Sequence, residues 1–305
     1  MKRFDVAVLT TTEYLRGDQN DWYIAQLTRE DQLLIDALES LDLSVQRLAW
    51  DDPAMDWSTT RVAVIRSCWD YFQRFGTFSS WLQRVASQTM LINPRELILW
   101  NSDKHYLTEL EARGVAIVPT RIIEAGQAVA LVSLCRDAGW HEIVIKPAVS
   151  ASANLTYRIP FAECDQYQSR FEQMLQSGAV LVQPFQHSIQ QHGELSLILL
   201  GGQYSHAIRK LPKAGDFRVQ DDHGGSVHDY QPSREEIAFA EQALHSVPFP
   251  ADYARVDLVR DQQGQVLLME MEMIEPELFF RLKEGSALLL AKAVASRLRN
   301  LAGSR

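Results

Sequence analysis

The 305-residue sequence predicts an α/β protein in which an open, mostly parallel sheet is followed by two mixed α+β units. Three observations predict this class. Apolar strand segments alternate with helical segments over residues 1 to about 95, which is typical of a parallel sheet. A compact series of short strands and helices follows. Two hairpin patterns, in which apolar residues alternate with polar ones around glycine-containing turns, lie after residue 195.

The composition indicates an ordinary globular protein. Hydrophobic residues make up 46% of the chain and charged residues 23%. The net charge of -9 argues against binding of nucleic acid through a basic surface. Because no stretch approaches the roughly 20 apolar residues that span a bilayer, we expect no membrane partner and a cytoplasmic location. The three cysteines lack C-x-x-C spacing and are expected to be buried thiols. Whether the chain forms a homodimer is not decided by the sequence.

The first unit is predicted over residues 1–96. Strands are expected at FDVAVLT, SVQRLAW, RVAVIRS and TMLINP, and helices at DQLLIDALESL, which starts at Asp31, and FSSWLQRVAS. Ligands of such sheets bind beyond the carboxyl ends of the strands. The candidate substrate contacts are therefore Thr12 after the first strand, and Arg66, Asp70 and Tyr71 at the end of the third. Packing is the alternative role for Tyr71.

The second unit is predicted over residues 97–184. It begins with a helix over residues 97–113 and continues with strands VAIVPTRII, EIVIKPA and AVLVQPF and with helices near residues 127–139 and 161–177. Lys146 stands near the end of an apolar strand, where an ammonium needs an anion. The small residues 148–153 that follow would let a backbone approach phosphate oxygens closely. A surface lysine in a loop is the alternative.

The third unit is predicted over residues 185–305. SLILLGGQYSHAIRK predicts a hairpin that turns at Gly201 and Gly202. A polar loop over residues 211–230 is long enough to suggest a function. Ser233 and Glu236 form a capping box for the next helix, and a last helix is expected from about Ser286.

The second hairpin, RVDLVRDQQGQVLLMEME, concentrates carboxylates. A four-residue loop over residues 261–264 would place Asp257 opposite Leu268 and on one face with Glu270 and Glu272. One more loop residue would move Asp257 to the opposite face. Three carboxylates on one face repel one another, and Mg²⁺ prefers such oxygen ligands. A solvated acidic face is the alternative. The other face is expected to enter a core through Val256, Leu258, Leu267, Met269 and Met271.

Taken together, these segments resemble the ATP-grasp superfamily of carboxylate–amine ligases, of the glutathione-synthetase and ribosomal-protein-glutamate-ligase type. The resemblance is carried in order by NSDK, IKP, VLVQPF, GELS, the loop RKLPKAGDFR with HGG after it, and the acidic hairpin. RSCWDY and EPELFF are similar to segments of the small ligases that include the cyclo-ligase of D-cycloserine biosynthesis. The resemblance implies an ATP-grasp fold with an N-terminal α/β domain, a small lid subdomain and a large C-terminal subdomain.

The resemblance also implies an ADP-forming ligase in which ATP activates a small amino-acid-like carboxylate as an acyl phosphate. An amine or another nucleophile would then form an amide bond or close a ring. ATP would be held by Lys104, Lys146, Ser150, Ser152, Gln183, Pro184, Phe185 and Glu194. Two Mg²⁺ ions, or Mn²⁺ in their place, would be held by Asp257, Glu270 and Glu272. Lys210 and Arg218 would stabilise the moving phosphoryl group or the tetrahedral oxyanion, Arg255 would orient a substrate carboxylate bidentately, and His223 would lie near the transferred phosphate.

Two acids are left without a settled role. Glu272 stands where many relatives carry asparagine. The glutamate adds a negative charge beside the metal ions and bears on the choice between Mg²⁺ and Mn²⁺. Glu275 is a metal ligand, a contact for a substrate amine or a structural acid. Two other functions also fit the resemblance: a nucleotide-binding module without ligase activity, and an amino-acid ligase that acts on peptides or protein tails.

Overall fold

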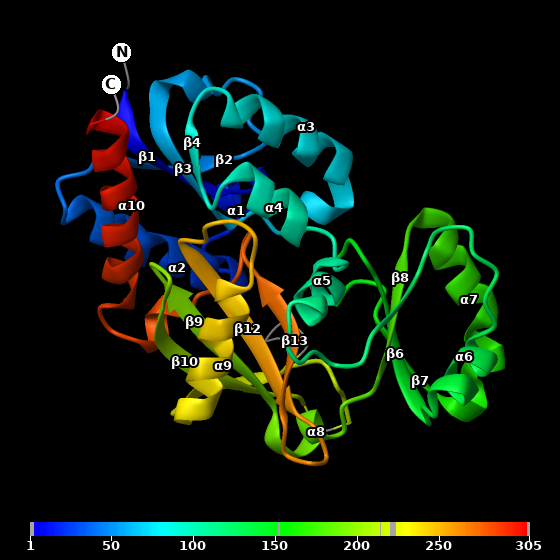
Figure 1. Ribbon diagram of the computed structural model, residues 1–305. Helices are drawn as coiled ribbons and strands as arrows, with labels where there is room; N and C mark the ends of the chain where they lie inside the picture. The colour runs from blue at the N-terminus through cyan, green and yellow to red at the C-terminus, as the bar shows by residue number, and fades with distance from the viewer. Residues whose placement is uncertain (1–2, 152, 214, 220–223, 304–305) are drawn as a thin grey trace.

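Three separate sheets organise the chain, which the computed structural model describes over residues 3–151, 153–213, 215–219 and 224–303 (Figure 1). The first sheet is parallel and four-stranded, as the alternation of strands and helices predicts. The second has four antiparallel strands and the third has five. None of the described helices is long and apolar enough to cross a membrane.

The N-terminal sheet has the strand order β2-β1-β3-β4 and lies between two helical layers. One face packs against α2 and the C-terminal helix α10, and the other packs against α3. The order reverses beside β1, so a ligand crevice is expected at the carboxyl ends of β1 and β3. The bounds are β1 Phe4–Thr10, β2 Val45–Ala49, β3 Thr60–Ser67, β4 Met90–Ile92, α1 Thr12–Arg16, α2 Trp22–Glu39, α3 Phe75–Ala86 and α10 Ser286–Gly303.

Helix α2 starts nine residues before the predicted start at Asp31. The side chain of Asp21 caps it by accepting hydrogen bonds from the backbone of Tyr23 and Ile24. The apolar spacing becomes regular only after Asp31, which is why the pattern alone placed the start too late. The cap is the signal that would have corrected it.

The predicted helix over residues 97–113 is two helices, α4 (Arg95–Asn101) and α5 (Tyr106–Ala112). The chain leaves the helical path between them, where the backbone N–H of Lys104 donates to the carbonyl of Ala148 at 3.0 Å. This break ties the entry segment to the small sheet and places Lys104 at the boundary between them.

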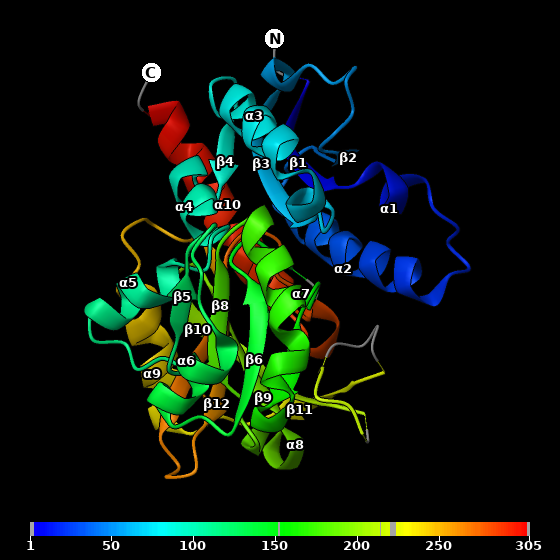
Figure 2. The same cartoon turned by 90° about the vertical axis from the view of Figure 1, so that its right-hand side faces the viewer.

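The small sheet has the order β5-β8-β6-β7, with α6 and α7 against it (Figure 2). The predicted strand over residues 115–123 is shorter, and β7 has no counterpart in the prediction. Cys135 and Cys164 lie in its core and Cys68 in that of the first sheet; all three are free and buried, as expected. The bounds are β5 Arg121–Ile123, α6 Leu131–Ala138, β6 Glu142–Pro147, β7 Tyr157–Pro160, α7 Cys164–Ser177 and β8 Val180–Pro184.

The large sheet has the order β11-β10-β9-β12-β13. The predicted turn of its first hairpin is confirmed, since Gly201 and Gly202 have φ of 60° and 82° between β9 and β10. The predicted capping box of Ser233 and Glu236 is present at the start of α9. Helix α8 and strand β11 were not expected. The bounds are α8 Ser188–His192, β9 Glu194–Leu200, β10 Gln203–Leu211, β11 Ser226–Tyr230, α9 Arg234–His245, β12 Tyr253–Arg260 and β13 Val266–Glu272.

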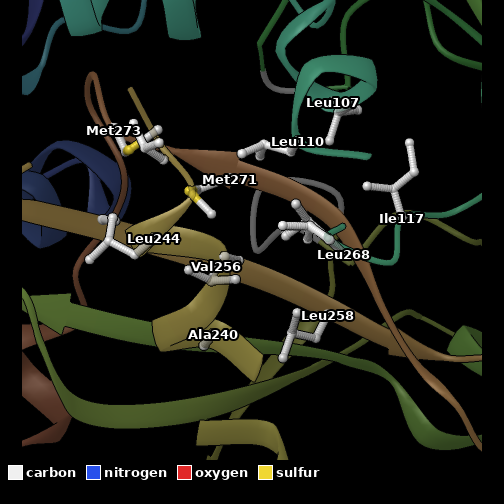
Figure 3. Close-up of a cluster of buried hydrophobic side chains, with 14 of the residues drawn as sticks. Leu107, Leu110, Ile117, Ala240, Leu244, Val256, Leu258, Leu268, Met271 and Met273 are labelled. Carbon is white, nitrogen blue, oxygen red and sulfur yellow. The ribbon is translucent and has the colours of Figure 1, made fainter. Parts of the chain in front are cut away.

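One face of the large sheet forms a core with α5 and α9. Figure 3 shows Val256, Leu258, Leu268 and Met271 of the acidic hairpin together with side chains of these helices. The opposite face of β12 and β13 is turned toward the small sheet, and the candidate site lies between them.

Candidate active site

The acidic hairpin pairs in a different register from the predicted one. Arg260 pairs with Val266, and the loop is closed by a bond from the backbone N–H of Asp261 to the carbonyl of Gln265 at 2.9 Å. The loop therefore has three residues and ends at Gly264, whose φ is 80°. An acid before the turn and a glycine at its left-handed position are typical of this loop, so the signal was present in the sequence.

A β-bulge restores the acidic face that this register would otherwise split. The register shifts by one between Asp257 and Leu258, so that Asp257 lies directly opposite Glu270 and Arg255 opposite Glu272. The three acids share one face, as predicted, but through a bulge that the prediction did not include. The extra residue, Met269, turns out of the core and lines the cleft.

Leu267 also departs from the predicted core, because it packs with Val259 on the cleft side. The expected face was wrong for Leu267 and Met269, although Leu267 is buried in a small core cluster, whereas the expectation for Val256, Leu258 and Met271 is confirmed.

Asp257 is the most buried of the three acids, at 3% exposure. Its carboxylate accepts hydrogen bonds from Arg255 at 2.9 to 3.1 Å and from the hydroxyl of Ser196 on β9. Burial opposes its ionisation, but Arg255 and Lys210 outweigh burial and lower the pKa of Asp257 to about 2. Asp257 is therefore a carboxylate at neutral pH. Ser196 was not among the predicted site residues, although it ends the GELS motif.

Glu270 draws together the two lysines that the sequence placed in different segments. Its carboxylate lies 3.2 Å from the Nζ of Lys104 and 3.5 Å from the Nζ of Lys146. Burial opposes ionisation of Glu270, but the two lysines lower its pKa below the ordinary value. Lys104 also donates to the backbone carbonyl of Ser150 at 2.6 Å, which connects this cluster to the small-residue segment.

Glu272 has the opposite electrostatic balance. It accepts a hydrogen bond from Arg255 at 2.5 Å. Burial, with the like charges of Asp257 and Glu270, raises the pKa of Glu272 to about 6 despite Arg255.

Lys210 joins the hairpin to the start of β9. Its Nζ lies 2.7 Å from Glu194 and 3.4 Å from Asp257. Burial and the positive charge of Arg255 oppose its protonation, but the two carboxylates raise its pKa above the ordinary value. Burial raises the pKa of Glu194, and Lys210 opposes this rise.

A cleft runs between the small and large sheets and has an empty volume of about 850 Å³, open to solvent. Its polar end is lined by Lys104, Lys146, Glu270 and Glu272, and Ser150 lies along its wall. Its apolar end is formed by side chains of both subdomains: Val118, Val144, Phe185, Ile189, Phe217, Val219 and Met269. The predicted segment Gln183, Pro184 and Phe185 lines this end. A slot of this size with one apolar and one charged end suits a nucleotide.

Arg218 reaches the cleft from the loop between β10 and β11. Asp216 holds its guanidinium, with 2.8 Å from Nη2 to Oδ2, and the pKa of Asp216 is lowered by this hydrogen bond. Phe217 lies beside Phe185 with 6.1 Å between ring centroids, so the loop covers the apolar end. Ser152 and His223 lie outside the described residues.

Thr12 and Asp70 at the edge of the N-terminal sheet are engaged within that domain. The hydroxyl of Thr12 donates to Asp51 at 2.8 Å, and Asp70 accepts from the indole N–H of Trp50 at 2.9 Å and pairs with Arg74. Neither residue lines the nucleotide cleft.

Arg66, Tyr71 and Glu275 come from the two sides of the boundary between the N-terminal sheet and the large sheet. Arg66 is 3% exposed, lies against the rings of Tyr253 and Phe280, and donates to the carbonyl of Pro276 at 3.0 Å. Tyr71 is buried in the core of the N-terminal sheet, which agrees with the packing role, and its pKa is raised by burial and by Glu275.

The hairpin acids suit a hard divalent cation by their chemistry, since carboxylate oxygens are the ligands of Mg²⁺ and Mn²⁺. As the structure stands, each of the three is paired with a lysine or an arginine. Among the described residues, no three His, Cys, Asp or Glu side chains converge as a metal site. Loading with metal therefore requires these pairs to open, and phosphate groups are natural new partners for the freed cations.

Comparison with known proteins agrees with this architecture. Residues 143–277 match the RimK-like ATP-grasp domain, and residues 6–93 match the N-terminal domain of D-cycloserine synthetase DcsG. The cycloserine biosynthesis protein DcsG of Streptomyces lavendulae is 32% identical over 284 residues, which cover 87% of this chain and 93% of that protein. The chain belongs to the ATP-grasp family and is a homologue of DcsG. It is an ATP-dependent ligase by family, and ligases of this family use ATP and Mg²⁺.

Two solved structures place the fold. The crystal structure of D-cycloserine synthetase DcsG has a TM-score of 0.84 at 28% identity and covers 96% of this chain and 99% of its own. The ATP-grasp ligase PsnB, complexed with the precursor peptide PsnA2 and AMPPNP, has a TM-score of 0.62 at 14% identity, covering 98% and 99%. The predicted ATP-grasp fold is confirmed by these matches.

Proposed function

We propose that the chain uses Mg-ATP to convert the carboxylate of a small amino-acid-like substrate into an acyl phosphate, which an amine or related nitrogen then attacks. The products are ADP, phosphate and a new C–N bond, formed between two molecules or within one as a ring closure. The observation that carries this proposal is the convergence on Glu270 of Lys104 and Lys146, which enter the site from two different subdomain edges.

The polar end of the cleft supplies what phosphoryl transfer needs, which is positioning and charge neutralisation. Lys104 and Lys146 would hold phosphate oxygens of ATP once these displace Glu270. The magnesium ions, bound by Asp257, Glu270 and Glu272, would supply charge compensation between the phosphates and the carboxylate substrate. Two ions are proposed because three acids share the face.

Three cations would act on the reacting groups. Arg255 is fixed by Asp257 and lies on the acidic face, so its guanidinium would be available to the negative charge that develops in the reaction. Lys210 supports the same region from β10. Arg218 would exchange Asp216 for the phosphate when the loop settles over the cleft.

The remaining nucleotide contacts would come from the walls of the cleft. Phe185 and the backbone of Gln183 and Pro184 would hold the adenine at the apolar end. Ser150 would reach a phosphate and Glu194 the ribose. The small sheet would act as a lid that keeps water from the acyl phosphate.

The experiment is a coupled assay of ADP release and hydroxamate formation with Mg-ATP, hydroxylamine and a panel of carboxylates. Hydroxylamine traps any acyl phosphate whatever the natural nucleophile is. We expect hydroxamate to form fastest with D-amino acids related to serine, and loss of the signal in Lys146→Met. ATP binding without carboxylate-dependent turnover would instead support a nucleotide-binding module. Hydroxamate on an acidic peptide alone would support a peptide ligase such as the PsnB structure suggests.

A further inference from the structure

Glu275 stands out among the charged residues near the site because no described lysine, arginine or histidine pairs with its carboxylate, whose hydrogen bond comes from its own backbone N–H. It is 5% exposed. Within the described part of the chain, no side chain donates a hydrogen bond to it and no lysine, arginine or histidine lies within ion-pair distance. The acids of the hairpin, by contrast, are each paired with a cation. A buried carboxylate without a partner carries a large desolvation cost, so such groups mark places where a ligand completes the pairing.

The backbone around Glu275 is held firmly against the N-terminal sheet. Its own carbonyl accepts from the indole N–H of Trp69 at 2.8 Å. The neighbouring carbonyls of Ile274 and Pro276 accept from Tyr253 at 2.7 Å and from Arg66 at 3.0 Å. Pro276 also restricts the backbone of Glu275 to extended conformations. The anchored backbone therefore keeps the carboxylate in place, and the carboxylate accepts a hydrogen bond from its own backbone N–H.

The position of Glu275 relates it to the reaction centre. It follows the acid Glu272 by three residues, on the segment that runs from β13 to the carboxyl edge of β3. Its pKa is raised well above the ordinary value by burial and by the charge of Glu272. The buried ring of Tyr71, from the N-terminal domain, is close enough that Glu275 and Glu272 both raise its pKa. A substrate carboxylate at the hairpin would thus have Glu275 three residues beyond Glu272, on the segment that leads to the N-terminal sheet.

We propose that Glu275 binds the ammonium group of a zwitterionic substrate and is the residue that selects amino acids over simple carboxylic acids. This inference rests on the proposed function. In an α-amino acid the ammonium and the carboxylate are both attached to the α-carbon, so a carboxylate presented to Arg255 and the metal ions carries its ammonium close to the acid just beyond the hairpin. The ion pair would replace the missing partner of Glu275.

The chain offers a matched control two residues further on. Glu277 lies on the same segment, but it is paired with Arg281 and accepts from Gln26 at 3.3 Å. Glu277→Gln should lower the melting temperature, because it breaks an existing pair. Glu275→Gln should raise the melting temperature of the unliganded protein, because it removes a buried carboxyl group whose ionisation burial opposes and which no described cation pairs. A structural acid would show the reverse.

The specificity test compares D-serine with 3-hydroxypropanoate, which lacks only the amino group, in the hydroxamate assay. We expect the wild type to prefer D-serine at least about a hundredfold in kcat/KM, as sites built for a polar group discriminate strongly. Glu275→Gln should lose most of this preference through a higher KM for D-serine, with less than about a threefold change for 3-hydroxypropanoate. Glu275→Asp should keep part of the preference, and Glu277→Gln all of it.

The outcomes separate the two proposals. If the wild type forms no hydroxamate with any carboxylate, the proposed function fails, and the melting temperatures with Mg-ADP and each acid then decide the role of Glu275. Stabilisation of the wild type but not of Glu275→Gln by D-serine supports the ammonium site. An unchanged preference in Glu275→Gln, or a fall in its unliganded melting temperature, overturns it.

Discussion

The two hairpins of the large sheet lie side by side, yet only one of them has the loop that its sequence first suggests. The β9–β10 hairpin turns at two glycines, both in left-handed conformations, as predicted. The β12–β13 hairpin has a three-residue loop where four were expected, and a bulge at Met269 that reverses the consequence. Both hairpins contain one register shift, but the shift in β12–β13 lies beside Asp257, within the acidic face.

The two hairpins differ in what determines their strand register. In the first, the two turn glycines and the burial of one strand face favour the same register, so local sequence rules predict it. In the second, the loop rule alone would turn Glu270 and Glu272 to the core face with Val256 and Leu258, away from Asp257, and the extra residue returns them to the side of Asp257. Bulges are concentrated next to active sites because they re-aim side chains in this way.

The largest effect is expected from removing the acid at the bulge. Asp257→Asn should lower ligase turnover about a thousandfold, because it removes a proposed metal ligand and leaves Arg255 and Lys210 without their shared partner. The measurement is carboxylate-dependent ADP release. Asp229→Asn, an exposed acid on β11 of the same sheet, is the control and should stay within about twofold. Equal activity of Asp257→Asn and the wild type would rule out the metal assignment.

The bulge places Met271 in the core and Met269 in the cleft, and alanine variants can distinguish the effects of these two positions. Met271 is 1% exposed in the core of Figure 3, so Met271→Ala should lower the free energy of unfolding by about 3 kcal/mol with little change in KM for ATP. Met269 lines the cleft, so Met269→Ala should raise KM for ATP several-fold at a smaller cost in stability. Denaturant unfolding and ATP titration measure both. A higher KM for ATP in Met271→Ala and a larger stability loss in Met269→Ala would mean that the bulge lies at another residue.

Alanine variants of the two turn glycines should lose similar amounts of stability and, unlike variants of the acids, should keep their activity. Gly202 and Gly264 have φ of 82° and 80°, and an added Cβ at either would meet no atom within 4 Å. Each alanine variant should therefore cost about 1 kcal/mol of stability from backbone conformation alone. We expect activity per folded molecule to be unchanged even for Gly264→Ala, because β9 also fixes β12. A tenfold activity loss there would show that the loop, and not the bulge, holds the acids.

The smallest effect is a pH dependence in the first hairpin. His206 on β10 bonds the carbonyl of Leu278 at 3.0 Å, and burial lowers its pKa, although Glu30 partly opposes this and Lys283 reinforces it. A histidine with a lowered folded-state pKa stabilises the fold above its unfolded value of about 6.5, and this contribution decreases as the pH falls below it. The wild type should thus lose more stability than His206→Gln between pH 7 and pH 5.5. The measurement is the melting temperature of both proteins across this pH range. Equal losses in the wild type and in His206→Gln would refute the lowered pKa of His206.

The sequence predicted the parts of this fold that local pattern controls. The parallel sheet, the Gly201–Gly202 turn and the Ser233 cap follow from periodicity and turn chemistry. The break at Lys104 does not, because a hydrogen bond to Ala148 from a distant segment interrupts a continuous apolar pattern.

The same limit applies to the site. The lysines and the acids could be named from motif order, but not which of them pair, since Glu270 meets both lysines only through tertiary packing. The unpaired state of Glu275 is a property of its surroundings, and no spacing in the sequence encodes it.

The cores divide the molecule differently from the sheets. Side chains of β1, β3, β9, β10, α2 and α10 form one continuous cluster, so the first and third sheets share a core. Among the described residues, the main cluster of the small sheet lies between residues 123 and 182, while Ala148 and Leu181 join the core of the large sheet. In native-state hydrogen exchange the first and third sheets should open together as one cooperative unit, while the small sheet opens at its own free energy. Closure over a nucleotide is thus available as movement of one pre-formed body against another, with repacking confined to the contacts of Ala148 and Leu181.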